Sequence, residues 1–115
     1  MLTASCHCGD VRVTVRTHPK SLTDCNCSIC RRYGVRWAYY YSDNVSVDAK
    51  PGSTDDYVWG QKSQKFVRCK TCGCIMYWQR FVPELPRDTM GVNARNFDPA
   101  ELGEIPIEQL DGAAF

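Results

Sequence analysis

Three cysteines lie within six residues of one another, and two arginines follow them directly. The cysteines are Cys25, Cys27 and Cys30, and the arginines are Arg31 and Arg32. Thiolates are favoured zinc ligands, and a zinc ion held by only three protein ligands keeps a fourth position for water or substrate. The spacing therefore predicts a reactive metal site rather than a purely structural one.

Two further pairs of cysteines lie far apart in the sequence. Cys6 and Cys8 are near the start, and Cys69 and Cys72 are late in the chain. Together they supply the four thiolates of a closed tetrahedral zinc site. The sequence thus predicts two zinc ions per chain, one with four cysteine ligands and one with three. The remaining cysteine, Cys74, is expected to be a small buried thiol.

A disulfide framework is the alternative use of eight cysteines in a small chain. The first residues lack the basic region and the apolar run of a signal peptide. We therefore expect a reducing, cytoplasmic environment, in which thiols remain free. Cysteines two positions apart in an extended segment also point to one side, which suits a shared ion better than a mutual disulfide.

Length and composition predict a single domain over residues 1–115. With 43% hydrophobic residues, the chain can form a modest core that a bound metal would reinforce. A net charge of +1 gives no long-range field for attracting nucleic acid or an anionic membrane. No stretch is long and apolar enough to cross a bilayer. For these two reasons, neither a nucleic acid nor a membrane is an expected partner.

Alternating apolar and polar residues, and runs rich in aromatic side chains, predict that the fold is mainly β. The expected strands lead into and out of the cysteine pairs, and a turn around Gly60 joins two of them. The final segment, rich in proline and glycine, is expected to be an edge. The expected strands cover residues 11–16, 35–41, 44–48, 56–59, 64–68, 74–78 and 89–97, with 105–112 as the extended final segment.

Two short helical turns are also expected. Ser28 as the N-cap and Gly34 as the C-terminal stop predict a turn over residues 29–33, directly behind the three-cysteine metal. Asp98 as the capping residue and Pro99 at the first helical position predict the second turn.

Four aromatic residues are candidates for the core or for the walls of a cleft. By default they are core residues, but one or two could line a cleft beside the three-cysteine metal. They are Trp37, Tyr39, Trp59 and Trp78.

Across essentially its full length, the chain resembles the glutathione-dependent formaldehyde-activating enzyme family, whose domain is also found in centromere protein V. The cysteine motifs and several short segments carry this resemblance. The resemblance implies a β-tent fold, in which small twisted antiparallel sheets are pinned by zinc. It also implies that the four-cysteine ion is structural and the three-cysteine ion reactive, as the spacing indicates. The matching residues are 5–9 (SCHCG), 25–32 (CNCSICRR), Phe66, 69–73 (CKTCG), 91–93 (GVN) and 110–112 (LDG).

The resemblance further implies a zinc-dependent carbon–sulfur lyase. In the namesake reaction, glutathione and formaldehyde condense to S-hydroxymethylglutathione. We therefore expect a small anionic thiol such as glutathione to bind with its sulfur at or near the three-cysteine metal. Its carboxylates would be held by Arg31 and Arg32, unless both are solvated surface charges.

A zinc-stabilised binding module for a protein, without catalysis, is the competing hypothesis. Near-neutral charge and the lack of identifiable interleaved aromatic residues disfavour the nucleic-acid version of it. Its support in the sequence is a basic cluster, made of Lys62, Lys65, Arg68 and Lys70.

Overall fold

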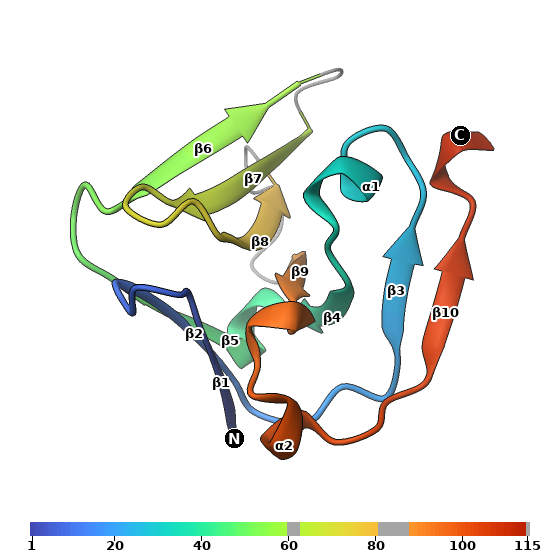
Figure 1. Cartoon of the computed structure of the whole chain (residues 1–115), viewed down its shortest axis with the longest axis horizontal. Helices are drawn as coiled ribbons and strands as arrows, with labels where there is room; N and C mark the ends of the chain where they lie inside the picture. Colours follow the sequence, from blue (N-terminus) through green and yellow to red (C-terminus); the bar gives the residue numbers. More distant parts are fainter. Residues whose placement is uncertain (60–62, 81–87, 115) are drawn as a thin grey trace.

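The computed structural model describes residues 1–59, 63–80 and 88–114 (Figure 1). These residues form ten strands, two short helices and three 3-10 turns, which confirms a mainly β fold with one or two helical turns. The strands are β1 (Leu2–Ser5), β2 (Val11–Val15), β3 (Leu22–Cys25), β4 (Trp37–Tyr41), β5 (Val45–Ala49), β6 (Thr54–Val58), β7 (Gln64–Cys69), β8 (Ile75–Arg80), β9 (Thr89–Asn93) and β10 (Ile107–Leu110). The helices are α1 (Cys30–Tyr33) and α2 (Pro99–Leu102), and the 3-10 turns are η1 (Ser42–Asn44), η2 (Ala94–Asn96) and η3 (Gly112–Ala114).

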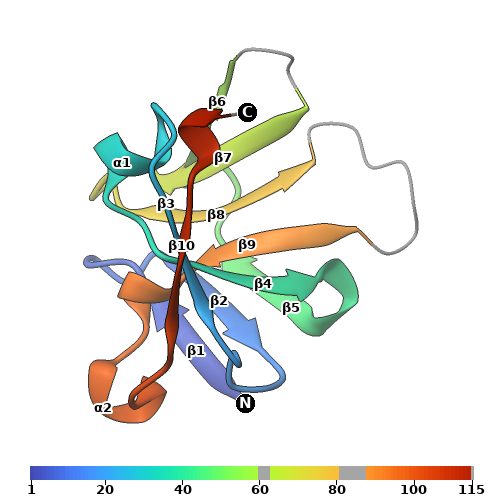
Figure 2. The ribbon, with the colours of Figure 1, turned by 90° about the vertical axis from the view of Figure 1, so that its right-hand side faces the viewer.

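The strands form two sheets. The smaller has the order β1-β2-β5, and the larger has the order β10-β3-β4-β9-β8-β7-β6. Every pair in both sheets is antiparallel except β10 with β3, which run parallel. The expected antiparallel sheets are therefore confirmed, with one parallel pair in addition. Figure 2 shows β10 running along β3 to a C-terminal turn close to α1.

Strand β2 shows how the sequence pattern produces the smaller sheet. Its valines Val11, Val13 and Val15 are fully buried, whereas Arg12 between them is exposed. Because side chains alternate across a strand, one face of β2 packs on the core and the other meets solvent. The predicted half-buried strand is thus confirmed.

The buried side chains form two clusters, and the second one surrounds three of the cysteines. The larger cluster joins both sheets and includes Met76, Val92 and Phe97. In the second, Cys25 and Cys30 pack with aromatic and aliphatic side chains. Since interiors are close-packed, this second cluster limits the movement of the two thiols. Its buried members are Cys25, Cys30, Val35, Trp37 and Phe66.

Two strands are missing from the sequence-based prediction, namely β1 and β3. Each has only four residues, and β3 does not alternate in burial, because both Leu22 and Thr23 are buried. The other strands lie at or within two residues of their predicted positions, except β9, which ends four residues earlier than predicted because residues 94–96 form the 3-10 turn η2. The predicted turn around Gly60 lies outside the described residues.

The helix signals were correct at three of four positions. Gly34 ends α1 with a φ of 68°, in the left-handed region that favours glycine. Asp98 caps α2 by accepting a hydrogen bond from the backbone N–H of Ala100, with Pro99 in the first turn. The assignment of Ser28 as the cap of α1 was wrong, because Ile29 occupies the N-cap position and no side chain caps this helix.

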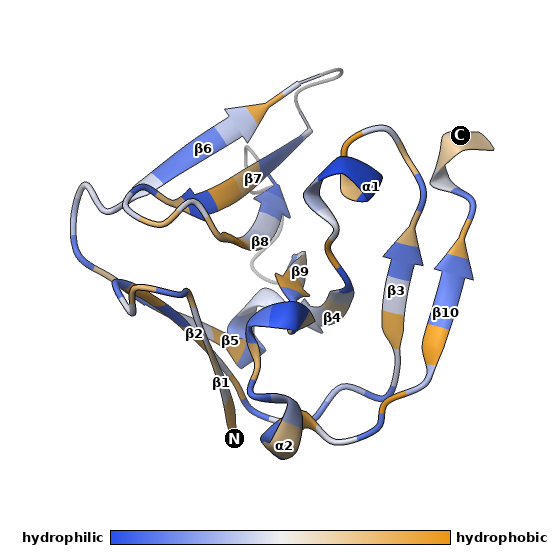
Figure 3. Cartoon of the chain, viewed as in Figure 1, coloured by the Kyte–Doolittle hydropathy of each residue, from blue (hydrophilic) through white to orange (hydrophobic). Residues whose placement is uncertain are grey.

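The two edge strands of the larger sheet, β6 and β10, have hydrophilic middle sections (Figure 3). Charged and polar side chains on an edge strand oppose pairing with a second chain. The predicted edge position of the last segment is confirmed by β10. Neither helix within the described ranges has the length and apolar character that a membrane crossing requires.

Candidate metal centre

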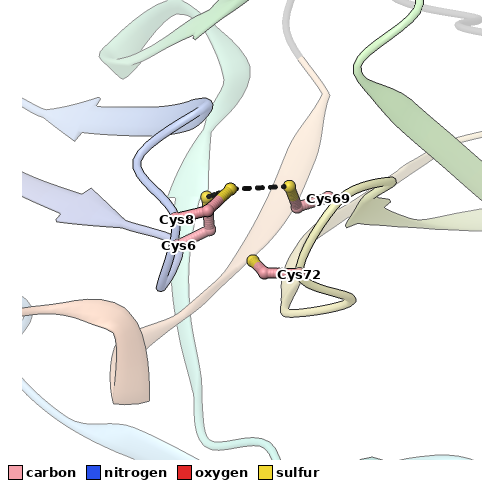
Figure 4. A group of neighbouring side chains, drawn as sticks. All are labelled: Cys6, Cys8, Cys69 and Cys72. Carbon is pink, nitrogen blue, oxygen red and sulfur yellow. Dashed lines mark hydrogen bonds between the residues drawn. The ribbon is translucent and has the colours of Figure 1, made fainter.

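Four thiols converge between the two sheets. The sulfur atoms of the four cysteines lie within 4.8 Å of one another, with Cys6 Sγ 3.7 Å from Cys8 Sγ and Cys8 Sγ 3.5 Å from Cys69 Sγ (Figure 4). Zn–S bonds of about 2.3 Å in a tetrahedron place sulfurs about 3.8 Å apart. The group of Cys6, Cys8, Cys69 and Cys72, called the four-thiol group below, therefore has the number and spacing of ligands to hold a metal ion.

Two turns present these thiols to each other. Cys6 and Cys8 lie in the connection between β1 and β2, where Gly9 has a φ of 87°. Cys69 ends β7, and Cys72 lies in the turn before β8. Backbone N–H groups also point at the sulfurs, as shown by the 3.3 Å bond from Val11 N to Cys6 Sγ.

Hydrogen bonding in this group favours a thiolate at Cys72. Burial disfavours the charged sulfur, but the backbone N–H groups of Cys74 and Cys8 and the neighbouring thiols together lower the pKa of Cys72 to about 5. Because only the thiolate binds a metal, such N–H···S bonds prepare a ligand.

The second group consists of the three clustered cysteines, and we call it the three-thiol group. Cys25 is the last residue of β3, Cys30 is the first residue of α1, and Cys27 lies in the loop between them. Their sulfurs also lie within 4.8 Å of one another. Thiolate sulfur selects soft or borderline metals such as zinc, so this group can hold such an ion with one coordination position left open.

The three thiols of this group have different environments. Burial raises the pKa of Cys30 to about 12, although the indole Nε1–H of Trp37 donates to its sulfur at 3.3 Å. Burial likewise raises the pKa of Cys25. Burial also disfavours the Cys27 thiolate, but hydrogen bonds from the backbone N–H and thiol of Cys30, the thiol of Cys25 and the backbone N–H of Ile29 outweigh it and lower the pKa of Cys27. Cys27 is thus the thiol of this group that ionises most readily.

An aromatic cavity of about 250 Å³ opens beside the three-thiol group, and we call it the thiol cavity. All four aromatic candidates from the sequence line it, more than the one or two expected. Gly91 makes room for one of them, because a Cβ at this position would overlap the indole of Trp78. The lining residues are Cys25, Cys27, Ile29, Cys30, Trp37, Tyr39, Trp59, Gln64, Phe66, Trp78, Leu110 and Gly112.

The C-terminal segment completes the wall of the thiol cavity. The Asn26 side chain donates to Asp111 Oδ1 at 3.0 Å and accepts from the backbone N–H of Ala113 at 3.0 Å. The Asn26 backbone N–H donates to the Leu110 carbonyl at 3.2 Å. This connection fixes Gly112 against Cys25. The motif match contained both Asn26 and Asp111, but the spacing gives no signal for their hydrogen bond across 85 positions.

The two predicted substrate-binding arginines have different surroundings. A second cavity, which shares Ile29 and Trp59 with the thiol cavity, lies next to it. Arg31 is exposed on α1 and lines neither of these two cavities. Arg32 lines the neighbouring cavity, and its Nη1 donates to the Ser28 carbonyl at 2.7 Å. Substrate binding by either residue stays a prediction, with Arg32 the better placed.

Cys74 belongs to neither thiol group. It is half-buried and packs against the larger core cluster, so its environment is close to that of the small buried thiol expected. The disulfide alternative is not realised, because all eight cysteines are free.

The basic cluster that supported a binding module is partly neutralised. Lys65 pairs with Asp56 at 3.6 Å, and Arg68 pairs with Asp55 at 3.7 Å. Lys62, another member of the cluster, lies outside the described residues. The two ion pairs reduce the positive field that a nucleic acid would require.

Comparison with known proteins agrees with this arrangement. The family model described as glutathione-dependent formaldehyde-activating enzyme matches residues 1–106, a range that contains both thiol groups. The crystal structure of a Rhodobacter sphaeroides protein is similar to this chain, with 29% sequence identity and a TM-score of 0.74. The alignment covers 93% of this chain and 100% of that one.

Proposed function

Because the chain belongs to the glutathione-dependent formaldehyde-activating enzyme family, we propose that it is a zinc-dependent carbon–sulfur lyase acting on a small thiol adduct. The proposed reaction joins glutathione and formaldehyde to S-hydroxymethylglutathione. The thiol sulfur forms a bond to the carbonyl carbon, the π electrons of the C=O bond move to the oxygen, and this oxygen takes up the proton that the thiol loses. No other reactant is needed.

The position of the three-thiol group at the wall of the thiol cavity is the observation that carries this proposal. Three ligands leave one coordination position open, and the cavity gives a small molecule access to it. A zinc ion bound there would lower the pKa of a thiol or polarise a carbonyl oxygen. The aromatic walls, including Trp37 and Phe66, would limit water around the reacting sulfur.

The four-thiol group has a different proposed role. Cys6, Cys8, Cys69 and Cys72 would hold a second zinc ion with no open position, and this ion would join the β1–β2 and β7–β8 connections. We also propose a cytoplasmic location, which the eight free thiols support. Residues 1–115 are proposed to form one domain.

Catalysis is tested by the rate at which S-hydroxymethylglutathione forms, measured by NMR above the uncatalysed rate. Cys27→Ser should reduce the enzyme-dependent rate by at least about 100-fold, because the metal loses a ligand. Cys74→Ser removes a thiol outside both groups and should retain the rate. A wild-type protein that contains two zinc ions and accelerates no thiol reaction would favour the binding module.

Thiol binding can be tested separately with cobalt in place of zinc, since a thiolate–cobalt band is visible. Glutathione should change this band, whereas S-methylglutathione, which has no thiol, should have little effect. Equal responses to both compounds, or none at millimolar glutathione, would contradict binding of the sulfur at the metal.

A further inference from the structure

A second cavity, of about 440 Å³, adjoins the thiol cavity. Ile29 and Trp59 line both cavities, so the two are neighbours along a shared wall. Phe66 of the thiol cavity also contacts Tyr33 of the second cavity, with ring centroids 5.9 Å apart. The second cavity is lined by Ser28, Ile29, Arg32, Tyr33, Tyr57, Trp59 and Arg68, and we call it the arginine cavity.

The two cavities differ in the chemistry of their walls. Among the described residues that line the arginine cavity, two are cationic and none is acidic. Arg32 comes from α1 and Arg68 from β7, so the positive charges face the space from different elements. A guanidinium has five N–H donors, and Arg32 uses Nη1 for the Ser28 carbonyl. The wall therefore favours an anionic group.

Arg68 keeps capacity for a ligand. Its contact with Asp55 is 3.7 Å long, and its side chain is 38% exposed. A carboxylate bound between the two arginines would form shorter, charge-assisted hydrogen bonds, for which the guanidinium fork is suited. Tyr57 and Trp59 present half-exposed rings, 46% and 43% exposed, against which a flat amide or carboxylate arm can pack.

The volumes of the two cavities give a second argument that a substrate occupies both. Pockets for small organic ligands usually have volumes of about 300–1,000 Å³. The thiol cavity, at about 250 Å³, is below this range, whereas the arginine cavity lies within it. A substrate with the length of glutathione can therefore place its sulfur in the thiol cavity and extend past Ile29 and Trp59 into the arginine cavity.

We propose that the arginine cavity is the subsite for the carboxylate-bearing arm of the thiol substrate, and that Arg68 determines the preference for anionic over uncharged thiols. This inference rests on the proposed function, because it takes the substrate sulfur to lie at the three-thiol group. It assigns Arg68, which the sequence analysis gave as part of the basic cluster of a binding module, to the binding of substrate.

The test compares glutathione with glutathione diethyl ester, in which both carboxylates are neutralised. In the wild-type zinc protein, kcat/KM for glutathione should exceed that for the diester by about tenfold, which is the effect of one charge-assisted hydrogen bond. Arg68→Gln should remove this preference mainly through a higher KM for glutathione. Arg68→Lys keeps the charge without the fork and should retain part of the preference.

Lys65→Gln is the matched control. Lys65 lies on the same strand, also pairs with an aspartate of β6, and lines neither cavity, so its removal should preserve the preference. Equal efficiency toward both compounds in the wild-type protein, or a preference that survives Arg68→Gln, would overturn the inference while leaving the lyase activity standing.

Failure of the proposed function gives a different result. If no thiol is turned over, titration calorimetry with the same two compounds still measures binding. Tighter binding of glutathione than of its diester, lost in Arg68→Gln and kept in Lys65→Gln, would support the subsite without the reaction. Equal binding of both compounds in that experiment would overturn the subsite as well.

Discussion

Gly112 shows how one residue at the C-terminal end determines the shape of the candidate site. A Cβ at this position would overlap Cys25 Sγ and would lie 3.2 Å from the Cβ of Cys27. Residues with side chains would therefore displace either the thiols or the tail. Only glycine allows the backbone to approach the three-thiol group this closely.

Gly112→Ala should reduce the metal content of the three-thiol group and lower the free energy of unfolding by about 1–3 kcal/mol, the usual cost of overpacking. Elemental analysis and denaturant titration measure the two effects. Ala114→Ser, at an exposed position in the same turn, serves as the control. Unchanged zinc content in Gly112→Ala would show that the thiols tolerate movement of the tail.

Tyr40 gives the protein a pH dependence that is independent of the thiols. Burial raises the pKa of Tyr40 to about 12 from the ordinary value of 10, and its hydroxyl donates to the Thr17 carbonyl at 2.8 Å. The native state therefore holds this proton more tightly than the unfolded chain does. The resulting stability is fully present below pH 10 and is lost as the pH rises toward 12.

We expect the free energy of unfolding to fall between pH 10 and pH 12, and expect this fall to be smaller in Tyr40→Phe. Denaturant titrations at a series of alkaline pH values measure it, with tyrosinate absorbance as the second signal. Tyr41→Phe, which removes a phenol from a half-exposed position, is the matched control. An identical alkaline fall in Tyr40→Phe and wild type would contradict this assignment.

At the scale of elements, β10 depends on the loop that carries Cys27. The parallel pairing of β10 with β3 extends over four residues of each strand, and the Asn26 side chain adds two hydrogen bonds beyond the end of the strands. So short an edge strand has little stability of its own. Asn26 therefore connects the loop of the three-thiol group to the segment that covers it.

Asn26→Ala should lower the free energy of unfolding by about 1–2 kcal/mol, because two hydrogen bonds are lost. Backbone amides of β10 should exchange with solvent faster, and hydrogen-exchange measurements detect this directly. Gln109→Ala changes an exposed side chain of the same strand and should leave the exchange rates nearly unchanged. Normal protection of β10 in Asn26→Ala would mean that the strand pairing is sufficient by itself.

The sequence predicted the elements whose signals are local. Gly34 and the Asp98–Pro99 pair determine backbone geometry within a few residues, and the alternation in β2 reports burial directly. The cysteine spacing also predicted both thiol groups, and for the four-thiol group it did so across distant segments, because two pairs of thiolates complete one four-coordinate zinc site.

The features that the sequence did not predict depend on contacts between distant segments. The pairing of β10 with β3 joins Leu22 to Ile107, and no residue in either strand specifies that partner. Arg68 belongs to the arginine cavity only because the β6–β7 hairpin lies beside α1. Ser28 was a plausible cap by residue type, but the Cys27 loop places Ile29 at that position.

At the scale of the whole molecule, the two thiol groups should contribute differently to stability. The four-thiol group joins β1–β2 to β7–β8, whereas the three-thiol group lies within one short segment. Structural zinc contributes about 10–16 kcal/mol in small domains, which equals or exceeds the usual 5–15 kcal/mol net stability of a protein. Loss of the four-thiol ion should therefore affect the entire fold.

We expect two zinc ions per chain, with Cys69→Ser unfolding the protein and Cys30→Ser leaving it folded. Elemental analysis gives the zinc content, and circular dichroism reports folding. Mild chelation should remove about half of the zinc first, because an open coordination position admits the chelator. Release of both ions in one step, or a folded Cys69→Ser protein, would contradict the separate roles.

A metal-bound four-thiol group would also determine how the chain responds to mechanical force. Cys8 and Cys69 are 61 positions apart. A metal ion bound to both sulfurs would therefore close a loop of the chain that contains most of the residues in the strands. A chain pulled at its ends would first extend only the segments outside this loop. The enclosed length, roughly 200 Å at about 3.3–3.6 Å per residue, would be released only when a metal–sulfur bond breaks. Single-molecule extension would therefore show a long, late step that disappears when a chelator is added.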